Sequence, residues 1–367
     1  MVEPKKLIRD LYRFPPELTG RTKETIRLDR NECTISFPAG HLRKILNSIK
    51  HGEITAYPQL EPFYKKLSKW LKVDRDQVLL TAGSDTAIKA VFEVYVSEGD
   101  EVVLFPPTYG MYPVYCDMFG AKKREVFYDD DFSLPVQRAL GAINQKTKLV
   151  AIPNPNHTGT VFKERELAEI LKKAKKHNAV VLIDEAYHHF YEGTMLPYID
   201  KFDNLIVIRT FSKAFGIAPL RIGYAVSNRD NIANLYKVKL THEITAVSAR
   251  FGEYLLDHPG IMKDYARGVR GGIKYLSKEF KKLGISCPTS YANFIYLRLP
   301  LGIDPDLVVK LLKEKNYHIR GLASSGPIKG HVRITVGPMP QMRKFMRVFK
   351  AVFNKAKHET DIRKFRP

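Results

Sequence analysis

The chain has 367 residues, 44% of them hydrophobic, so it can build the cores of about two domains. No run reaches the roughly 20 apolar residues of a membrane-spanning helix, and the first ten residues lack the apolar centre of a secretory signal. The formal net charge is +21, but it is spread over helix-like segments without a nucleic-acid recognition motif, so a solvated surface or steering of an anionic substrate explains it more simply than nucleic acid does.

The cysteines and histidines do not form a metal-binding pattern. Cys33, Cys116 and Cys287 are far apart, and nothing argues for a disulfide, so a cytoplasmic location is expected. His188 and His189 are adjacent, and adjacent side chains of a strand or turn diverge. We therefore expect no metal.

Residues 1 to about 30 have a weak pattern and are expected to form an arm that packs on another element or on a partner subunit. From Gln77 to Val226 the chain then alternates short apolar runs with amphipathic stretches, of which 164–176 has helical spacing. Runs of four or five apolar residues are typical of strands buried on both faces of a mostly parallel sheet. They are 77–80, 101–105, 148–152, 179–183, 205–208 and 222–226. The pattern predicts a wound α/β domain.

The last third of the chain predicts a smaller α+β domain. Residues 241–258 indicate a connecting helix, strands are expected near 293–299 and 331–336, and a closing helix over 341–357. We therefore divide the chain into an arm (1–44), a large domain (45–260) and a small domain (261–367).

Polar residues follow several of the apolar runs, which is where open α/β sheets bind ligands. Gly83, Ser84 and Asp85 stand between a strand and a helix expected to begin near Thr86. Glycine permits close approach and the free N–H groups of a helix start bind phosphate, although an ordinary helix cap is the alternative.

Asp184 ends a buried strand, and a buried carboxylate needs a partner. A protonated pyridine nitrogen is one such partner, and a salt bridge to a Lys or Arg is the other. Tyr187 can direct its phenol toward the same ring. Asn156 offers an amide to a ring hydroxyl and Tyr109 a stacking surface, but asparagine-rich turns and lone aromatic residues are also common without a ligand.

Lys213 follows the strand 205–208 and stands between Ser212 and, eight residues on, Arg221. This set can hold an aldehyde as a Schiff base and its phosphate as a dianion. Signatures of dinucleotide, P-loop, zinc-protease and serine-hydrolase sites are missing from the sequence.

Together these residues resemble the fold-type I pyridoxal-phosphate enzymes, specifically class I/II aminotransferases of the histidinol-phosphate aminotransferase group. The resemblance extends from Leu28 to Gly337 and is strongest over 184–187 and 209–224. It implies pyridoxal 5'-phosphate as the cofactor, an amino acid and a 2-oxo acid as substrates, and a homodimer.

Carried over by position, the resemblance makes Lys213 the Schiff-base lysine, Asp184 the partner of the ring nitrogen, and Tyr187 and Asn156 the pair at the phenolic oxygen. Tyr109 is the stacking aromatic. The phosphate is surrounded by Gly83, Ser84, Asp85, Ser212, Arg221 and Tyr57, the last reaching the partner subunit's cofactor. Substrate binding falls to Arg333 for the α-carboxylate, to Arg320 for a distal phosphate, and to Asn31.

The sequence departs from the family pattern around the substrate. His157 replaces the proline of Asn-Pro-Thr-Gly, Cys33-Thr34 replaces Asn-Pro, Thr86 replaces an acidic residue, and Arg13-Phe14 replaces Pro-Tyr. The resemblance therefore implies ping-pong transamination of an amino acid or amino phosphate. An amino-acid-phosphate decarboxylase of the same fold, or a basic binding protein without turnover, are the alternatives.

Overall fold

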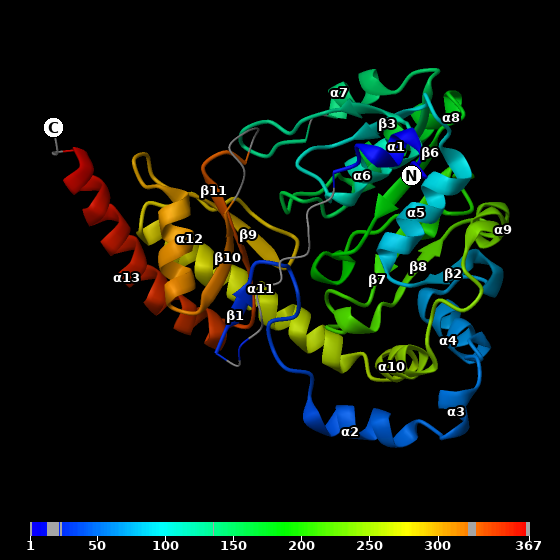
Figure 1. The fold of residues 1–367 in the computed structure, drawn as a ribbon, viewed down its shortest axis with the longest axis horizontal. Coiled ribbons are helices and arrows are strands. Elements are labelled where there is room, and N and C mark those ends of the chain that lie inside the picture. The colour runs from blue at the N-terminus through cyan, green and yellow to red at the C-terminus, as the bar shows by residue number, and fades with distance from the viewer. Residues whose placement is uncertain (1, 13–21, 23, 135, 322–327, 365–367) are drawn as a thin grey trace.

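The structure is a computed structural model that describes residues 2–12, 22, 24–134, 136–321 and 328–364. Two sheets lie side by side, and the helix α11 runs from one to the other (Figure 1). Among the described residues, no helix combines the length and apolarity needed to cross a bilayer.

The larger sheet has seven strands in the order β2-β8-β7-β6-β5-β3-β4. Only β8 runs in the direction opposite to the other six strands, so the expected mostly parallel wound sheet is confirmed. The strands are β2 (Val78–Thr81), β3 (Glu101–Leu104), β4 (Lys122–Glu125), β5 (Thr147–Pro153), β6 (Val180–Asp184), β7 (Leu205–Thr210) and β8 (Gly223–Val226).

Alternate residues of the central strands enter two different cores. Val181 and Val207 belong to one core, and their neighbours Leu182 and Ile206 belong to the other. One face is covered by α5 (Ser84–Tyr95), α6 (Met111–Phe119) and α9 (Arg229–Val238). The other is covered by α4 (Glu61–Leu71), α7 (Val136–Ala142), α8 (Glu164–Lys176), α10 (Ala246–Asp257) and α11 (Gly260–Lys282). Burial on both faces explains why these strands are continuous apolar runs.

The smaller sheet has the order β1-β10-β11-β9. Its strands are β1 (Ile26–Leu28), β9 (Phe294–Arg298), β10 (Tyr317–Gly321) and β11 (His331–Thr335). The arm thus supplies an edge strand that pairs in parallel with β10. The helices α12 (Pro305–Glu314) and α13 (Met339–Lys364) pack beside this sheet.

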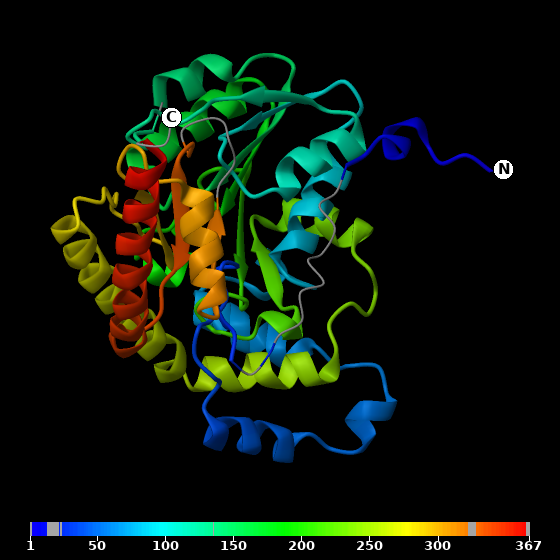
Figure 2. The ribbon, with the colours of Figure 1, turned by 60° about the vertical axis from the view of Figure 1, so that its left-hand side comes forward.

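The remaining elements are short or lie outside these layers. α2 (Ala39–Ser48) and α3 (Gly52–Thr55) lie along the outside of the molecule, with α2 next to α10 (Figure 2). The others are α1 (Lys6–Arg9), η1 (Arg75–Gln77), η2 (His188–Phe190), η3 (Leu196–Tyr198) and η4 (Ala218–Leu220).

Two expected helix starts were wrong by a few residues. α5 begins at Ser84 rather than near Thr86, because Ser84 and Asp85 take helical positions directly after Gly83. α10 begins at Ala246 rather than at 241, because the Thr245 side chain accepts a hydrogen bond from the Ser248 N–H and caps the helix there.

Candidate active site

The site lies at the carboxyl edge of the large sheet, where β6 and β7 end beside each other. Asp184 is the last residue of β6 and pairs in register with Ile208 of β7, and Lys213 follows three residues after β7 ends. The parallel direction of the two strands therefore delivers both side chains to one place.

The carboxylate of Asp184 is buried and held by two donors. Tyr112 Oη donates to Oδ2 over 3.1 Å, and the Ala186 N–H donates to Oδ1 over 3.0 Å. Burial raises the pKa of Asp184 to about 6, against these hydrogen bonds and the nearby charge of Lys213, which lower it. A buried anion of this kind is stabilised by a cationic group placed against it.

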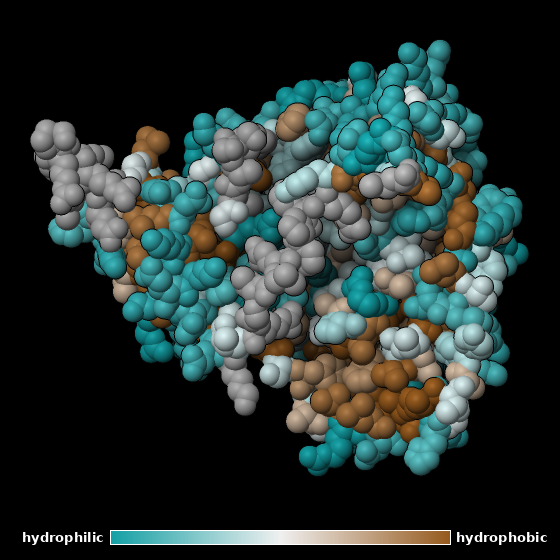
Figure 3. All heavy atoms as spheres, in the orientation of Figure 1, coloured by the Kyte–Doolittle hydropathy of each residue, from teal (hydrophilic) through white to brown (hydrophobic). Residues whose placement is uncertain are grey.

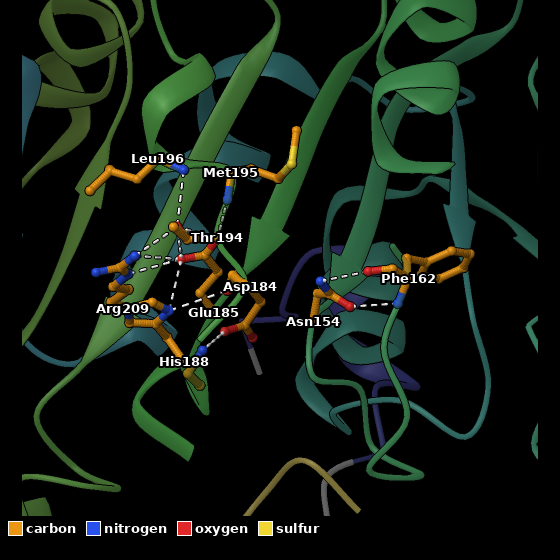
Figure 4. A network of polar contacts seen from close by, with 11 residues as sticks. Asn154, Phe162, Asp184, Glu185, His188, Thr194, Met195, Leu196 and Arg209 are labelled. Carbon is orange, nitrogen blue, oxygen red and sulfur yellow. Dashed lines mark hydrogen bonds and ion pairs between the residues drawn. The ribbon is translucent and has the colours of Figure 1, made fainter. Parts of the chain in front are cut away.

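The Asp184 strand end is braced by a buried ion pair. Arg209 donates from Nε and Nη2 to Glu185 Oε2 at 2.9 and 2.8 Å, and Thr194 and the Met195 N–H also donate to this carboxylate. Figure 4 shows this network beside Asp184. The sequence analysis does not predict this ion pair, although Glu185 and Arg209 both lie in the two segments where the family resemblance is strongest.

The amine of Lys213 contacts the arm and the Tyr187 ring. Its Nζ donates to the Asn31 carbonyl over 3.2 Å and lies 5.7 Å from the ring centroid of Tyr187. Burial, followed by the charge of Arg333, lowers the pKa of Lys213 to about 8. The lowered pKa increases the neutral fraction of the amine near pH 7, and the neutral amine is the form that attacks an aldehyde.

The segment around Gly83 forms a cradle for an anion. Gly83 has φ +86°, and a Cβ there would lie 2.3 Å from Arg221 Nη2. A Cβ at Gly223 would lie 2.2 Å from the Ser84 nitrogen, at the first turn of α5. Arg221 Nη1 also lies 3.4 Å from Ser212 Oγ. A helix start, an arginine and a hydroxyl thus meet where two glycines leave room, which suits a phosphate.

Two more of the expected cofactor residues lie beside this cradle. Tyr109 follows β3 and packs edge-to-face on Tyr112. Burial, followed by the charges of Asp85 and Asp184, raises the pKa of Tyr109. Asp85 accepts a hydrogen bond from Tyr115 Oη at 3.1 Å, so its carboxylate faces α6.

Tyr57 lies apart from these residues. Its ring stacks on His242 with centroids 4.1 Å apart and is 75% exposed.

The substrate side is built by the small sheet and the arm. Arg333 on β11 is buried and stands opposite Arg320 of β10, whose side chain is exposed. Asn31, with φ +54°, donates from its amide to Tyr187 Oη over 2.9 Å and from its N–H to Thr335 Oγ1 over 2.9 Å. The arm therefore connects the small sheet to Lys213 and Tyr187. Arg13-Phe14 lies outside the described residues.

Asn156 and Tyr187, the pair expected at the cofactor's phenolic oxygen, have different hydrogen-bond partners in the protein. Asn156 Oδ1 accepts from the Thr158 N–H at 2.7 Å and its Nδ2 donates to Thr160 Oγ1 at 2.9 Å, so the amide closes its own turn. The phenol of Tyr187 is paired with Asn31 instead. The neighbouring His157 contacts Arg333, and sequence reasoning missed it because a histidine replaces the expected proline there.

The family model described as "Aminotransferase class I and II" matches residues 24–349. The chain belongs to this family. The aminotransferase is 34% identical to the histidinol-phosphate aminotransferase of Caldanaerobacter subterraneus subsp. tengcongensis over 315 residues, which are 84% of this chain and 88% of that protein. It is 32% identical to the enzyme of the same name from Clostridium novyi, covering 91% and 93%.

A solved structure shares the fold. It is the histidinol-phosphate aminotransferase of Sinorhizobium meliloti in complex with pyridoxal-5'-phosphate, with a TM-score of 0.85 at 21% identity and coverage of 97% and 98% of the two chains. The recognised resemblance to class I/II aminotransferases is thereby confirmed.

Proposed function

We propose that this aminotransferase moves an amino group from an amino acid or amino phosphate to a 2-oxo acid, with histidinol phosphate as one substrate. Transamination with pyridoxal 5'-phosphate is the activity of the family. The observation that carries the site assignment is the placement of Lys213 and Asp184 at the ends of two adjacent strands beside the Gly83–Arg221 cradle.

The residues present fit pyridoxal phosphate. The cradle at Gly83, Ser84, Ser212 and Arg221 would hold the phosphate, and the buried Asp184 carboxylate would accept a hydrogen bond from a protonated ring nitrogen. Tyr109 would stack on the ring, and Tyr187 would donate to its phenolic oxygen. When bound, the cofactor supplies an electron sink for the carbanion at the substrate's α-carbon.

The chain's own residues do the remaining work. Lys213 would bond the cofactor's aldehyde, and the lowered pKa of its amine suits it to act as a general base for the proton on the substrate's α-carbon. Asp184 would keep the ring nitrogen protonated. Arg333 offers a planar set of donors to a carboxylate, and its Nε is buried and makes no hydrogen bond of normal geometry to the described residues.

Exposed apolar side chains support a homodimer. Leu240 is 70% exposed and Ile54 64%. Ile54 is three residues before Tyr57, and Leu240 is two residues before His242, on which the Tyr57 ring stacks. Figure 3 shows hydrophobic atoms exposed at the lower end of this face, in the region of α2 and α10. We propose that this surface meets a second copy and that Tyr57 enters the partner's phosphate site.

We also propose a cytoplasmic location, because the three cysteines are widely separated in the sequence and nothing in it argues for a disulfide.

The substrate assignment is tested by single half-reactions. Cofactor-loaded enzyme is mixed separately with histidinol phosphate and with L-glutamate, and the carbonyl product is counted by mass spectrometry. One product per site from each amine supports the proposal. Failure of histidinol phosphate while glutamate reacts would assign a different amino substrate. Release of carbon dioxide from threonine phosphate would favour the decarboxylase alternative.

A further inference from the structure

His157 occupies a turn whose polar atoms are otherwise used locally. It follows β5 directly after Asn156, whose amide is bonded to Thr158 and Thr160. The imidazole points the other way, toward the small sheet. Arg333 Nη1 lies 2.7 Å from His157 Nε2.

This contact fixes the state of the imidazole. A guanidinium has only donors, so Nε2 of His157 must be the acceptor and the ring must be neutral, with its proton on Nδ1. The surroundings agree with that state. Burial, together with the charges of Arg333, Lys213 and Arg320, holds the pKa of His157 well below its usual value.

A second acceptor completes the orientation of Arg333. Its Nη2 donates to the Asp29 carbonyl over 2.9 Å, and its Cζ lies 5.5 Å from the ring centroid of Phe294. The His157 ring lies beside the same phenylalanine, with centroids 6.0 Å apart. Acceptors on both terminal nitrogens prevent rotation of the guanidinium plane.

The directions of the remaining donors of Arg333 are therefore fixed. An arginine carries five N–H donors, and these two contacts occupy one on each terminal nitrogen. The Nε is buried and makes no hydrogen bond of normal geometry to the described residues, and the hydroxyl of Tyr296 lies near the guanidinium. A planar, pre-oriented fork binds a carboxylate with little further loss of side-chain entropy.

We propose that His157 is a positioning residue for substrate recognition, which as a neutral imidazole orients Arg333 for the carboxylate of the 2-oxo acid and amino acid substrates. The inference rests on the proposed function, because it takes Arg333 as the carboxylate site. His157 stands where the family pattern has a proline. Its role would be specific to the binding of substrates that carry a carboxylate.

The test compares three variants of the cofactor-loaded enzyme. His157→Leu removes the acceptor. His157→Gln places an amide oxygen near the position of Nε2. His177→Leu replaces a half-buried histidine at the end of α8 and serves as the control. The dissociation constant of 2-oxoglutarate is measured by calorimetry, and that of pyridoxal phosphate is measured separately on the cofactor-free chains.

Loss of a hydrogen bond to a charged group should weaken 2-oxoglutarate binding by about tenfold in His157→Leu. Glutamine should restore most of it, and the affinity for pyridoxal phosphate should stay within about twofold. A merely structural role would lower both affinities together, and that result would overturn the proposal.

Arg333→Met separates the two claims. If it loses 2-oxoglutarate binding while His157→Leu binds as the unmodified enzyme does, the positioning role is wrong and the proposed function stands. If Arg333→Met itself binds 2-oxoglutarate normally, Arg333 is not the carboxylate site, and both this inference and that part of the proposed function fail. In the double variant, the two losses should not add, because His157 acts only through Arg333.

Discussion

The guanidinium of Arg221 lies over the Cα of Gly83 so closely that a Cβ on residue 83 would stand 2.3 Å from Nη2. Both residues have positive φ, +86° at Gly83 and +50° at Arg221. A side chain on residue 83 would therefore displace the Arg221 guanidinium from its place beside the start of α5.

The first prediction concerns this contact. Gly83→Ala should displace Arg221 and weaken pyridoxal phosphate binding at least tenfold, measured by fluorescence titration of the cofactor-free chain. Gly99→Ala is the matched control, since Gly99 has φ +89° but nothing within 4 Å of an added Cβ. Equal losses in the two variants would show that backbone strain, and not the cradle, is responsible.

The second prediction is the pH dependence of cofactor capture. Only the neutral amine of Lys213 attacks the aldehyde, and the pKa of this amine in the cofactor-free site is lowered to about 8. The rate of capture should therefore rise with pH and level off above about 8, whereas an ordinary lysine would continue to gain up to about 10. Stopped-flow absorbance after mixing cofactor-free chain with pyridoxal phosphate measures it.

The third prediction concerns Asp184. Its pKa is about 6 in the folded cofactor-free chain and about 3.9 when unfolded, so the ionised group destabilises that chain above about pH 6, and the destabilisation fades as the pH falls through 6 toward 4. Asp184→Asn should raise the free energy of unfolding at pH 7 by about 3 kcal/mol while abolishing turnover. Urea unfolding tests this, with the exposed Asp203→Asn as a control that should change little.

The fourth prediction concerns the buried pair of Glu185 and Arg209. Removing either partner leaves an uncompensated charge, so Glu185→Gln and Arg209→Met should each lower the free energy of unfolding by about 3–5 kcal/mol. The double variant should recover part of the loss, as measured by urea unfolding. Additive losses would mean that the two charges are not coupled in the folded chain.

The fifth prediction tests whether Tyr57 acts across a dimer. Lys213→Ala lacks the amine and Tyr57→Ala lacks the phenol, so each homodimer has two defective sites. A mixed dimer carries one site with both residues intact. Co-refolding the two variants should therefore restore activity up to about a quarter of that of the unmodified enzyme, as expected from random pairing. Activity no greater than the average of the two separate variants would place Tyr57 outside the partner's site.

The sequence predicts the large sheet well because its central strands are buried on both faces and read as apolar runs. β4 is not predicted, because it is not an apolar run. Its Lys-Lys-Arg-Glu sequence is exposed at all four positions, and it is a strand only because it pairs with β3 at the sheet edge. β1 likewise depends on pairing with β10, almost 300 residues away in the chain. Such pairing is set by tertiary contacts that local pattern does not contain.

In the active site, too, the sequence predicts some residues and not others. Asp184 and Lys213 could be predicted because each follows a strand that the pattern reveals. The contact of His157 with Arg333 could not be predicted, because adjacent side chains of a turn point in different directions and the course of this turn is set by hydrogen bonds of Asn156 to Thr158 and Thr160. Asn31 was expected only at the substrate, yet its backbone and amide contact both Lys213 and Tyr187.

The central claim is that Lys213 carries the cofactor, and borohydride reduction tests it most directly. The enzyme is loaded with pyridoxal phosphate, reduced, digested and analysed by mass spectrometry. The account predicts one phosphopyridoxyl group per chain, on the peptide containing Lys213, and none on that peptide in Lys213→Ala. Stoichiometric label on another lysine, or no label after the aldehyde is supplied, would contradict it.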